Sequence, residues 1–298
     1  MMYFSPLPDR VILAVSGEDT PDFLQGLITK DIKKVSAGEA VFAALLSPQG
    51  RFLFDFFITE REGRFLLETD RERLPELIKR LTMYRLRSKV QFETLDEQVA
   101  AVWGVSRHPE PKAKDLREIL RSAQNDDSLV YTDPRLPDLG WRVAGKEIPA
   151  FAGMTRGDYE KHRLSLGISE GAKDLIIDRS IILEYGYDEM GAVDFDKGCY
   201  VGQEVTARSK HRATLRKFIH MVRAESALPP KGTPVLAGER EAGTMASSEG
   251  VIGLAHLRVE EIVRAAREKI PLTAAGITLA ATLPPWCKTA FADGVLTS

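Results

Sequence analysis

Cysteine is scarce in this chain of 298 residues: there are two, Cys199 and Cys287, far apart in the sequence. No C-x-x-C pair occurs, so neither a zinc site nor a disulfide framework is expected. Two thiols also cannot supply the four thiolates that usually hold an iron–sulfur cluster, so we expect no permanently bound metal. Free thiols in a reducing compartment are the default expectation.

Long apolar runs, a secretory signal and a strong net charge are also missing. No apolar stretch approaches the ~18 residues of a membrane span, and the amino-terminal MMYFSP lacks the basic and apolar regions of a signal. Lysine and arginine number 41 against 43 acidic residues, a net charge of 41 − 43 = −2, so no global field attracts nucleic acid. We therefore expect a cytoplasmic protein without membrane or nucleic-acid partners.

The length suits two or three hydrophobic cores, and the character of the chain changes twice along it. After residue 106 the composition shifts to Pro, Lys, Asp, Asn and Ser, and after Arg216 short strands with Pro and Gly turns follow. We expect three parts: an N-terminal α+β part at 1–106, a second part with insertion-like loops and the cysteine motif at 107–213, and a C-terminal β-barrel at 214–298.

Alternation and helical spacing define the expected elements. Asp19-Thr20-Pro21 predicts a helix start capped by Asp19, and SPQG at 47–50 predicts a hairpin turn. The strand after that turn is apolar on both faces, so we place it inside a sheet. The pattern predicts an antiparallel-rich sheet with helices on one face. The expected strands are 41–46, 51–59, 64–68, 89–92, 99–105, 218–224, 242–247 and 251–257, and two expected helices are 74–84 and 157–166.

The segment DFDKGCYVGQE at 194–204 concentrates chemically active side chains in a stretch with few aliphatic residues. Gly198 and Gly202 bracket Cys199 at a spacing that suits a tight turn leading into a short helix. The free amides of a helix starting near Gly202 would point back toward Cys199 and, together with Lys197, would favour a thiolate there. The alternative is a structural cysteine in a connecting loop.

The residues KGCYVGQE at 197–204 resemble the signature of the YgfZ family, folate-binding relatives of the glycine-cleavage T protein that assist iron–sulfur protein maturation. Similar segments cover nearly the whole chain, and the cysteine motif is the most specific of them. The further segments are VSGED at 15–19, FLQGL at 23–27, LSPQGR at 46–51, RLRSKV at 85–90, DPRLP at 133–137, GISEG at 167–171 and LPPW at 283–286.

The resemblance implies an α+β fold like that of the T protein, an antiparallel-rich body followed by a small C-terminal β-barrel. It also implies tetrahydrofolate or a folate derivative as cofactor, and iron–sulfur client or carrier proteins as partners. Any cluster would belong to a client, with Cys199 and Lys197 as the working residues. The expected folate contacts are Asp55, Arg163, Tyr200, Gln203, Glu204 and Arg208.

Asp55 is the one carboxylate in the phenylalanine-rich strand FLFDFF at 52–57, most of which we expect in the core. Burying an unpaired carboxylate is costly, so Asp55 should pair with Arg51 or Arg163, or face a cavity. The T protein has two adjacent aspartates at the matching position, one of them catalytic, whereas this chain has Phe54 beside Asp55. This departure argues against efficient aminomethyl transfer and leaves Asp55 as a contact for folate amines.

A run of cations from Ala207 to Lys217 contains no acid. It suits a polyanion such as a polyglutamate tail, a phosphate backbone or an acidic protein, or it is a solvated helix end. The absence of interleaved aromatics weakens the case for base stacking. The role of Glu204 is also open: it either stabilises a helix start by its charge or orients Lys197 or a ligand. The cations are Arg208, Lys210, Arg212, Arg216 and Lys217, with His211 among them.

Three functions stay open on these residues. The leading hypothesis is a folate-binding accessory factor for iron–sulfur cluster assembly, in which Cys199 holds a mixed disulfide, a persulfide or a one-thiolate contact to a cluster in transit. The alternatives are a folate-dependent aminomethyl transferase and a module that binds RNA or an acidic protein through residues 208–217. Because half of the carboxylate pair is missing, we expect an accessory factor rather than a typical enzyme.

Two stretches look unlike the family, 116–127 and 148–155. Both resemble translated mobile palindromic repeats found inside some bacterial genes. Our hypothesis is that both stretches are tolerated surface insertions, and whether the wider ranges 109–130 and 146–156 are dispensable stays open.

Overall fold

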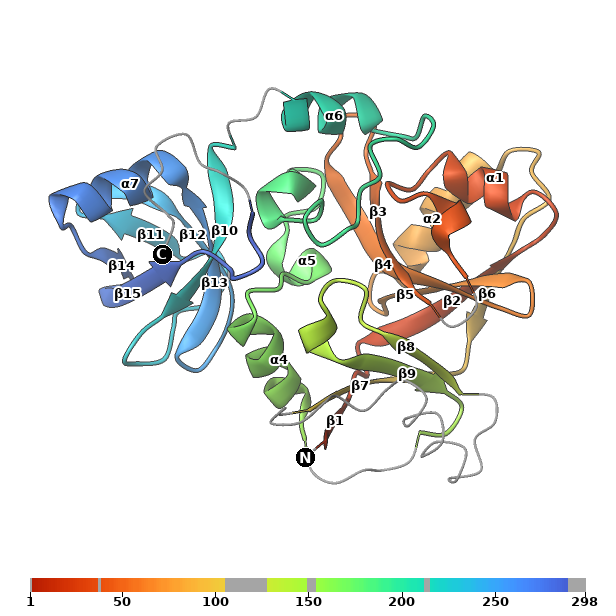
Figure 1. Ribbon diagram of the computed structural model, residues 1–298, viewed down its shortest axis with the longest axis horizontal. Coiled ribbons are helices and arrows are strands. Elements are labelled where there is room, and N and C mark those ends of the chain that lie inside the picture. The colour runs from red at the N-terminus through yellow and green to blue at the C-terminus, as the bar shows by residue number, and fades with distance from the viewer. Residues whose placement is uncertain (1, 37–38, 105–127, 149–153, 212–214, 289–298) are drawn as a thin grey trace. The chain divides into compact units, whose positions relative to one another are not determined.

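The computed structural model describes residues 2–36, 39–104, 128–148, 154–211 and 215–288 (Figure 1). The chain forms two compact units, each assembled from several segments. None of the described helices is both long enough and apolar enough to cross a membrane. The first unit comprises Met1–Leu46, Leu53–Tyr159 and Met190–Val201, and the second comprises Ser47–Phe52, Glu160–Glu189 and Gly202–Ser298.

A five-stranded sheet organises the first unit, with two helices on one of its faces. Its strand order is β3-β4-β5-β2-β6, and the register of β2 against β5 and β6 is antiparallel. Residues from α1 and α2 share one buried cluster with residues of β2, β3 and β4, so the predicted helix-covered sheet is confirmed. The bounds are β2 Arg10–Ser16, α1 Thr20–Gln25, a 3₁₀ turn Ile32–Lys34, β3 Val41–Leu46, β4 Phe52–Arg61, β5 Arg64–Asp70, α2 Leu74–Arg85 and β6 Gln91–Leu95.

The hairpin between β3 and β4 forms as its sequence predicts. The amide of Ser47 donates to the carbonyl of Arg51 at 2.8 Å, and Gly50 closes the turn with φ of 70°. β4 lies between β3 and β5 and is buried along its first eight residues, as expected for an interior strand. The predicted helix cap is wrong: the Asp19 side chain accepts from the amide of Lys89 at 2.7 Å and makes no cap bond to α1.

A four-stranded sheet, β1-β7-β9-β8, completes the first unit, and buried ions join it to the other sheet. Glu68 of β5 accepts from Arg10 at 2.9 Å and from the hydroxyl of Tyr131 on β8. Arg142 of β9 donates to Asp133 at 3.1 Å. Because paired charges tolerate burial where single ones do not, these ions let two polar strand faces meet. The bounds are β1 Met2–Pro6, β7 Gln98–Gly104, β8 Leu129–Thr132, a 3₁₀ turn Pro137–Leu139 and β9 Trp141–Gly145.

The predicted insertions 109–130 and 146–156 lie mostly outside the described residues, but their edges do not. Val130 is 2% exposed and pairs with Val143 in the register of β8 against β9. The helix α4 begins at Arg156. Removing residues up to 130 would delete half of β8, so the range 109–130 is not dispensable as a whole, whereas the stretch 116–127 lies outside the described residues and stays a prediction.

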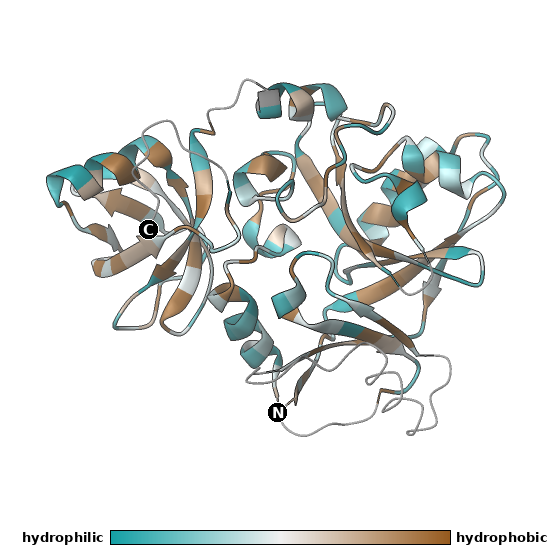
Figure 2. Ribbon diagram, in the orientation of Figure 1, coloured by the Kyte–Doolittle hydropathy of each residue, from teal (hydrophilic) through white to brown (hydrophobic). Residues whose placement is uncertain are grey.

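A closed six-stranded barrel forms most of the described second unit, as predicted for the C-terminal part (Figure 1, pale to dark blue). The strands follow the closed order β10-β13-β12-β11-β14-β15, and α7 adds Ile262 and Ala265 to the barrel core. Figure 2 shows brown apolar residues along the strands, while α7 combines brown and teal faces. The barrel elements are β10 Lys217–Arg223, β11 Pro234–Ala237, β12 Arg240–Glu249, β13 Ile252–Arg258, α7 Val259–Glu268, β14 Leu272–Ala274 and β15 Ile277–Thr282.

Trp286, beyond the last barrel strand, packs on helical segments of the same unit. Its indole Nε1 donates to the carbonyl of Leu166 at 2.9 Å, and its ring centroid lies 6.4 Å from that of Phe218. Gly186 has φ of 70°, and a Cβ there would come within 2.3 Å of the Trp286 ring. The remaining described helical segments are α4 Arg156–Ser165, which begins in the first unit, α5 Gly171–Asp174, a 3₁₀ turn Ile182–Tyr185 and α6 Gln203–His211.

Gly186→Ala should therefore destabilise the protein more than a comparable glycine substitution. Gly191 is the matched control, since it has φ of 74° but no atom within 4 Å of the position that a Cβ would take. Both variants carry a left-handed backbone cost of roughly 1–2 kcal/mol, and overpacking against Trp286 adds about 1–3 kcal/mol in Gly186→Ala alone. Urea unfolding of both variants measures the difference, and equal losses would contradict the packing of Trp286 on Gly186.

Candidate functional site

The cysteine segment, residues 192–201, lies along the stretch that follows α1. Three hydrogen bonds to backbone carbonyls run along it. Thr29 Oγ1 donates to the carbonyl of Ala192 at 2.7 Å, the amide of Asp194 donates to the carbonyl of Thr29 at 3.0 Å, and the amide of Val201 donates to the carbonyl of Gly26 at 3.2 Å. Neither stretch is a regular strand at these positions, so side chains must add to what holds them together.

Lys197 provides the strongest of these attachments. Its ammonium donates to the carbonyls of Gln25, Ile28 and Lys30 at 2.8, 2.7 and 2.9 Å, which uses all three of its N–H groups. Gln25 is the last residue of α1, so one of these bonds satisfies a helix carbonyl that has no partner within the helix. Burial lowers the pKa of Lys197 to about 8, while the carboxylates of Asp31 and Asp194 act to raise it. The ammonium form therefore prevails at pH 7.

Asp194 ties the start of the cysteine segment to the same stretch. Its carboxylate accepts from the ammonium of Lys34 at 2.7 Å, from the amide of Asp31 at 2.8 Å and from Lys30 at 3.3 Å. Burial acts to raise the pKa of Asp194, but these hydrogen bonds outweigh it and leave the pKa below its ordinary value. Asp194 thus stays ionised near neutral pH and fixes the segment ahead of Cys199.

Cys199 is an exposed free thiol between two anchored neighbours. Lys197 is held two residues before it, and Val201 is bonded to Gly26 two residues after it. The preceding Gly198 has no atom within 4 Å of the position that a Cβ would take, so its surroundings are open. The segment therefore displays the thiol to solvent. Lys197 contributes to this display by position, because its donors are committed to carbonyls.

Tyr200 and Asp55 are the two predicted folate contacts of the first unit. Tyr200 is buried, with its ring centroid 5.1 Å from the ammonium of Lys197, so its ring packs against that ammonium. Asp55 is 8% exposed in β4, and Thr69 donates to its backbone carbonyl at 3.1 Å. Both expected partners of Asp55 bond within the second unit instead, where Arg51 donates to the carbonyl of Arg179 at 3.0 Å.

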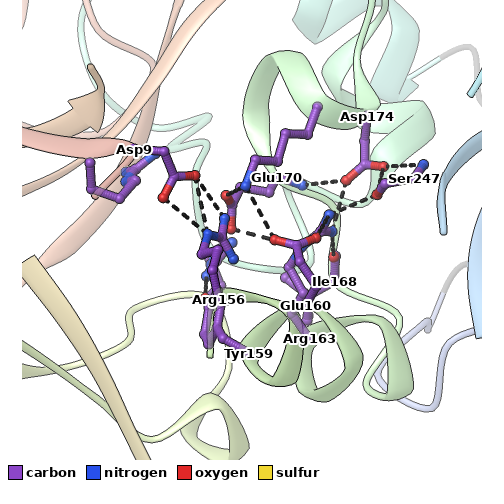
Figure 3. A network of polar contacts seen from close by, with 12 residues as sticks. Asp9, Arg156, Tyr159, Glu160, Arg163, Ile168, Glu170, Asp174 and Ser247 are labelled. Carbon is purple, nitrogen blue, oxygen red and sulfur yellow. Dashed lines mark hydrogen bonds and ion pairs between the residues drawn. The ribbon is translucent and has the colours of Figure 1, made fainter. Parts of the chain in front are cut away.

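Arg163 is fully buried within a polar network of the second unit (Figure 3). It donates to Glu160 at 2.9 Å, to Asp174 at 2.9 Å and to the hydroxyl of Ser247 at 2.7 Å. Asp174 also accepts from the amide of Ser247 at 2.9 Å, which links α5 to barrel strand β12. The guanidinium therefore holds two helices to the barrel, and this explains its position without any ligand.

The other predicted contacts of the second unit belong to α6. The helix starts at Gln203, directly after Gly202 with φ of 84°, as the motif predicted. Glu204 and Arg208 form an exposed (i, i+4) ion pair, which is worth about 0.5 kcal/mol or less. Lys210 pairs with Asp188 at 2.7 Å, so the basic run is partly neutralised by acids from elsewhere. Residue 212 of that run lies outside the described residues.

Sequence reasoning missed the two groups that hold the site, Asp194 and the carbonyls around Lys197. Asp194 and Asp196 are alike in sequence, and only the fold shows which one meets Lys30, Lys34 and the amide of Asp31. Backbone carbonyls carry no sequence signal at all. The six predicted folate contacts are divided, with Asp55 and Tyr200 in the first unit and the rest in the second.

The chain resembles known proteins over most of its length. Residues 216–289 match the family model described as the CAF17 C-terminal beta-barrel domain. Over 95% of the chain, it is 34% identical to the protein of Homo sapiens named "Iron-sulfur cluster assembly factor IBA57, mitochondrial", and the match spans 85% of that protein. The protein of Coccidioides immitis named as an IBA57 homolog is 32% identical over 78% of this chain, which spans 59% of that longer relative.

A solved structure shares the fold. The glycine cleavage system aminomethyltransferase T from Bartonella henselae superposes with a TM-score of 0.70, covering 97% of this chain and 87% of that one, at 14% sequence identity. The predicted fold, a T-protein-like α+β body with a C-terminal barrel, is thereby confirmed. The predicted cytoplasmic location is contradicted, because the relatives are named as mitochondrial proteins. The lack of a recognisable secretory signal was not sufficient evidence for a cytoplasmic location.

Lys197→Met should loosen the cysteine segment and destabilise the protein by about 3 kcal/mol, because three carbonyls lose a charged donor. Lys33→Met is the matched control, since Lys33 is exposed on the same stretch and its loss should change stability by less than about 0.5 kcal/mol. Urea unfolding monitored by circular dichroism compares the two. Equal stability of both variants would contradict the anchoring role of Lys197.

Proposed function

Because this chain belongs to the IBA57 family of iron–sulfur cluster assembly factors, we propose that it supports cluster assembly or insertion in client or carrier proteins. The resemblance of its cysteine motif to YgfZ pointed to the same kind of factor and the same T-protein-like fold. The relatives from Homo sapiens and Coccidioides immitis carry the name IBA57, which is the more specific identification.

Cys199 is the working thiol in this proposal. What supports the choice is its exposure on a segment that Lys197 and Asp194 fasten to the first unit. Such a thiol can reach a partner protein without any rearrangement of its own backbone. Among the described residues, no group of three or more His, Cys, Asp or Glu is suited to hold a metal ion. A cluster in transit would therefore take one thiolate from Cys199 and its other ligands from the partner.

Positioning is the proposed role of Lys197. A single-thiolate contact is weak by itself, so it gains from a thiol that is already fixed in place when the partner arrives. Three carbonyl bonds from Lys197 provide that fixation close to Cys199 in the chain. The buried ring of Tyr200 packs against the same ammonium.

A folate is the proposed cofactor, with Asp55 as its contact in the first unit. A buried carboxylate provides an acceptor in an otherwise apolar strand, which suits the amino and ring N–H groups of a pterin. Arg163, Glu204 and Arg208 are engaged with partners inside the protein, so they are not assigned to the ligand. A bound folate would supply one-carbon or redox chemistry, while the residues of this chain would bind and orient it.

The two alternative functions have less support. Aminomethyl transfer needs a second carboxylate beside Asp55, where this chain has Phe54. Binding of a polyanion through residues 208–217 is weakened because Arg208 and Lys210 are paired with Glu204 and Asp188.

Cys199→Ala should abolish the support of iron–sulfur enzymes while leaving the fold intact, because the side chain is exposed. Cys287→Ala is the matched control, as it removes the other thiol, which is partly buried. Both variants are expressed in a host strain that lacks its own factor of this family, and the activities of iron–sulfur enzymes are measured. Full activity with Cys199→Ala would remove this thiol from the mechanism.

Tetrahydrofolate should raise the melting temperature, since a ligand selective for the native state stabilises it by about 2.7 kcal/mol at a hundredfold excess over Kd. Asp55→Asn keeps the shape of the side chain but loses its charge, so tetrahydrofolate should raise its melting temperature much less than that of the parent chain. Differential scanning calorimetry with both proteins makes the comparison. An unchanged melting temperature of the parent chain would exclude folate as a ligand, without bearing on the role of Cys199.

A further inference from the structure

We propose that a cavity in the first unit binds a small amphipathic carboxylate. The cavity encloses about 500 Å³ beside strands β1 and β7, where Phe4 and Leu7 meet Val99 and Ala100. Arg71 and Gln98 are the polar residues of its lining. None of these residues belongs to the cysteine segment or to the residues proposed for folate, so the site is separate from the proposed function.

The lining selects a ligand with an apolar body. Phe4, Leu7, Val99 and Ala100 are apolar residues of this lining and are buried in the wall behind it, so that wall is hydrocarbon. The volume lies within the range of about 300–1,000 Å³ that small-molecule sites occupy. Water fills such a space poorly, because each ordered water needs two or more polar partners.

Arg71 selects a carboxylate as the polar end of the ligand. Its guanidinium is oriented by two bonds, from Nε to the carbonyl of Pro8 at 2.9 Å and from Nη2 to the carbonyl of Arg10 at 3.0 Å. An arginine has five N–H donors, so three stay available to an anion. The described residues that line the cavity include no acid, and a guanidinium binds a carboxylate by paired, charge-assisted hydrogen bonds.

Gln98 adds a second polar contact at the same mouth. Its side chain is exposed at the start of β7, while its backbone pairs with Gly145. The amide can donate to a carboxylate or accept from a hydroxyl, so it can hydrogen-bond to either polar group of a ligand without adding charge to the site. A lining with one cation, one amide and otherwise hydrocarbon therefore fits a monocarboxylate of medium chain length.

The test uses isothermal titration calorimetry of the full chain with decanoate and with decanol, which lacks the charge. Decanoate should bind at least tenfold more tightly than decanol. Arg71→Gln should lower the affinity for decanoate at least tenfold, and Arg71→Lys should retain part of the affinity that Arg71→Gln loses. Arg87→Gln, an exposed arginine outside the cavity, is the control and should bind like the parent chain.

Ala100→Leu tests the place of binding, because it fills the cavity from β7; circular dichroism establishes that this variant folds. Loss of decanoate binding in the folded variant supports the site. Unchanged binding in Ala100→Leu, equal affinity for decanol and decanoate, or no binding of decanoate to the parent chain would each overturn the proposal. If Ala100→Leu does not fold, the affinities of Arg71→Gln, Arg71→Lys and Arg87→Gln for decanoate test the proposal; equal affinities of Arg71→Gln and the parent chain would overturn it.

Discussion

The ammonium of Lys197 inside a ring of three carbonyls is the interaction on which the cysteine site depends. The carbonyls of Gln25, Ile28 and Lys30 come from the end of α1 and the irregular stretch behind it. One buried charge thus satisfies three backbone acceptors and draws a distant part of the chain onto them. Cys199 is displayed because its neighbours are held.

Buried charges perform the same kind of task elsewhere in the molecule. Asp174 and Arg163 join helices to barrel strand β12 in the second unit, and Glu68 joins the two sheets of the first through Tyr131 and Arg142. Removing one member of such a pair leaves the other charged and buried, which typically costs about 3–5 kcal/mol. Arginine in these networks is therefore structural, and its presence near a proposed ligand site is weak evidence for binding.

Local patterns predicted the fold well. The SPQG turn, the interior strand β4, helix α2 and the barrel strands β10, β12 and β13 each follow from residues close together in the sequence, whereas the short barrel strands β11, β14 and β15 were not predicted. Partners could not be predicted in the same way: Asp19 meets the amide of Lys89 rather than α1, and Lys197 meets carbonyls of residues 25–30 rather than the thiol. The motif predicted the start of α6 after Gly202, but only tertiary contacts assign positions to its side chains.

Amide hydrogen exchange in Lys197→Met tests the anchoring of the cysteine segment most directly. The amides of Asp194 and Val201, bonded to Thr29 and Gly26, report on it from both sides of Cys199. If Lys197 holds the segment, these two amides should exchange at least a hundredfold faster in the variant, while barrel amides such as that of Met245 keep their protection. Unchanged protection at Asp194 and Val201 would show that Lys197 is not what holds the thiol in place.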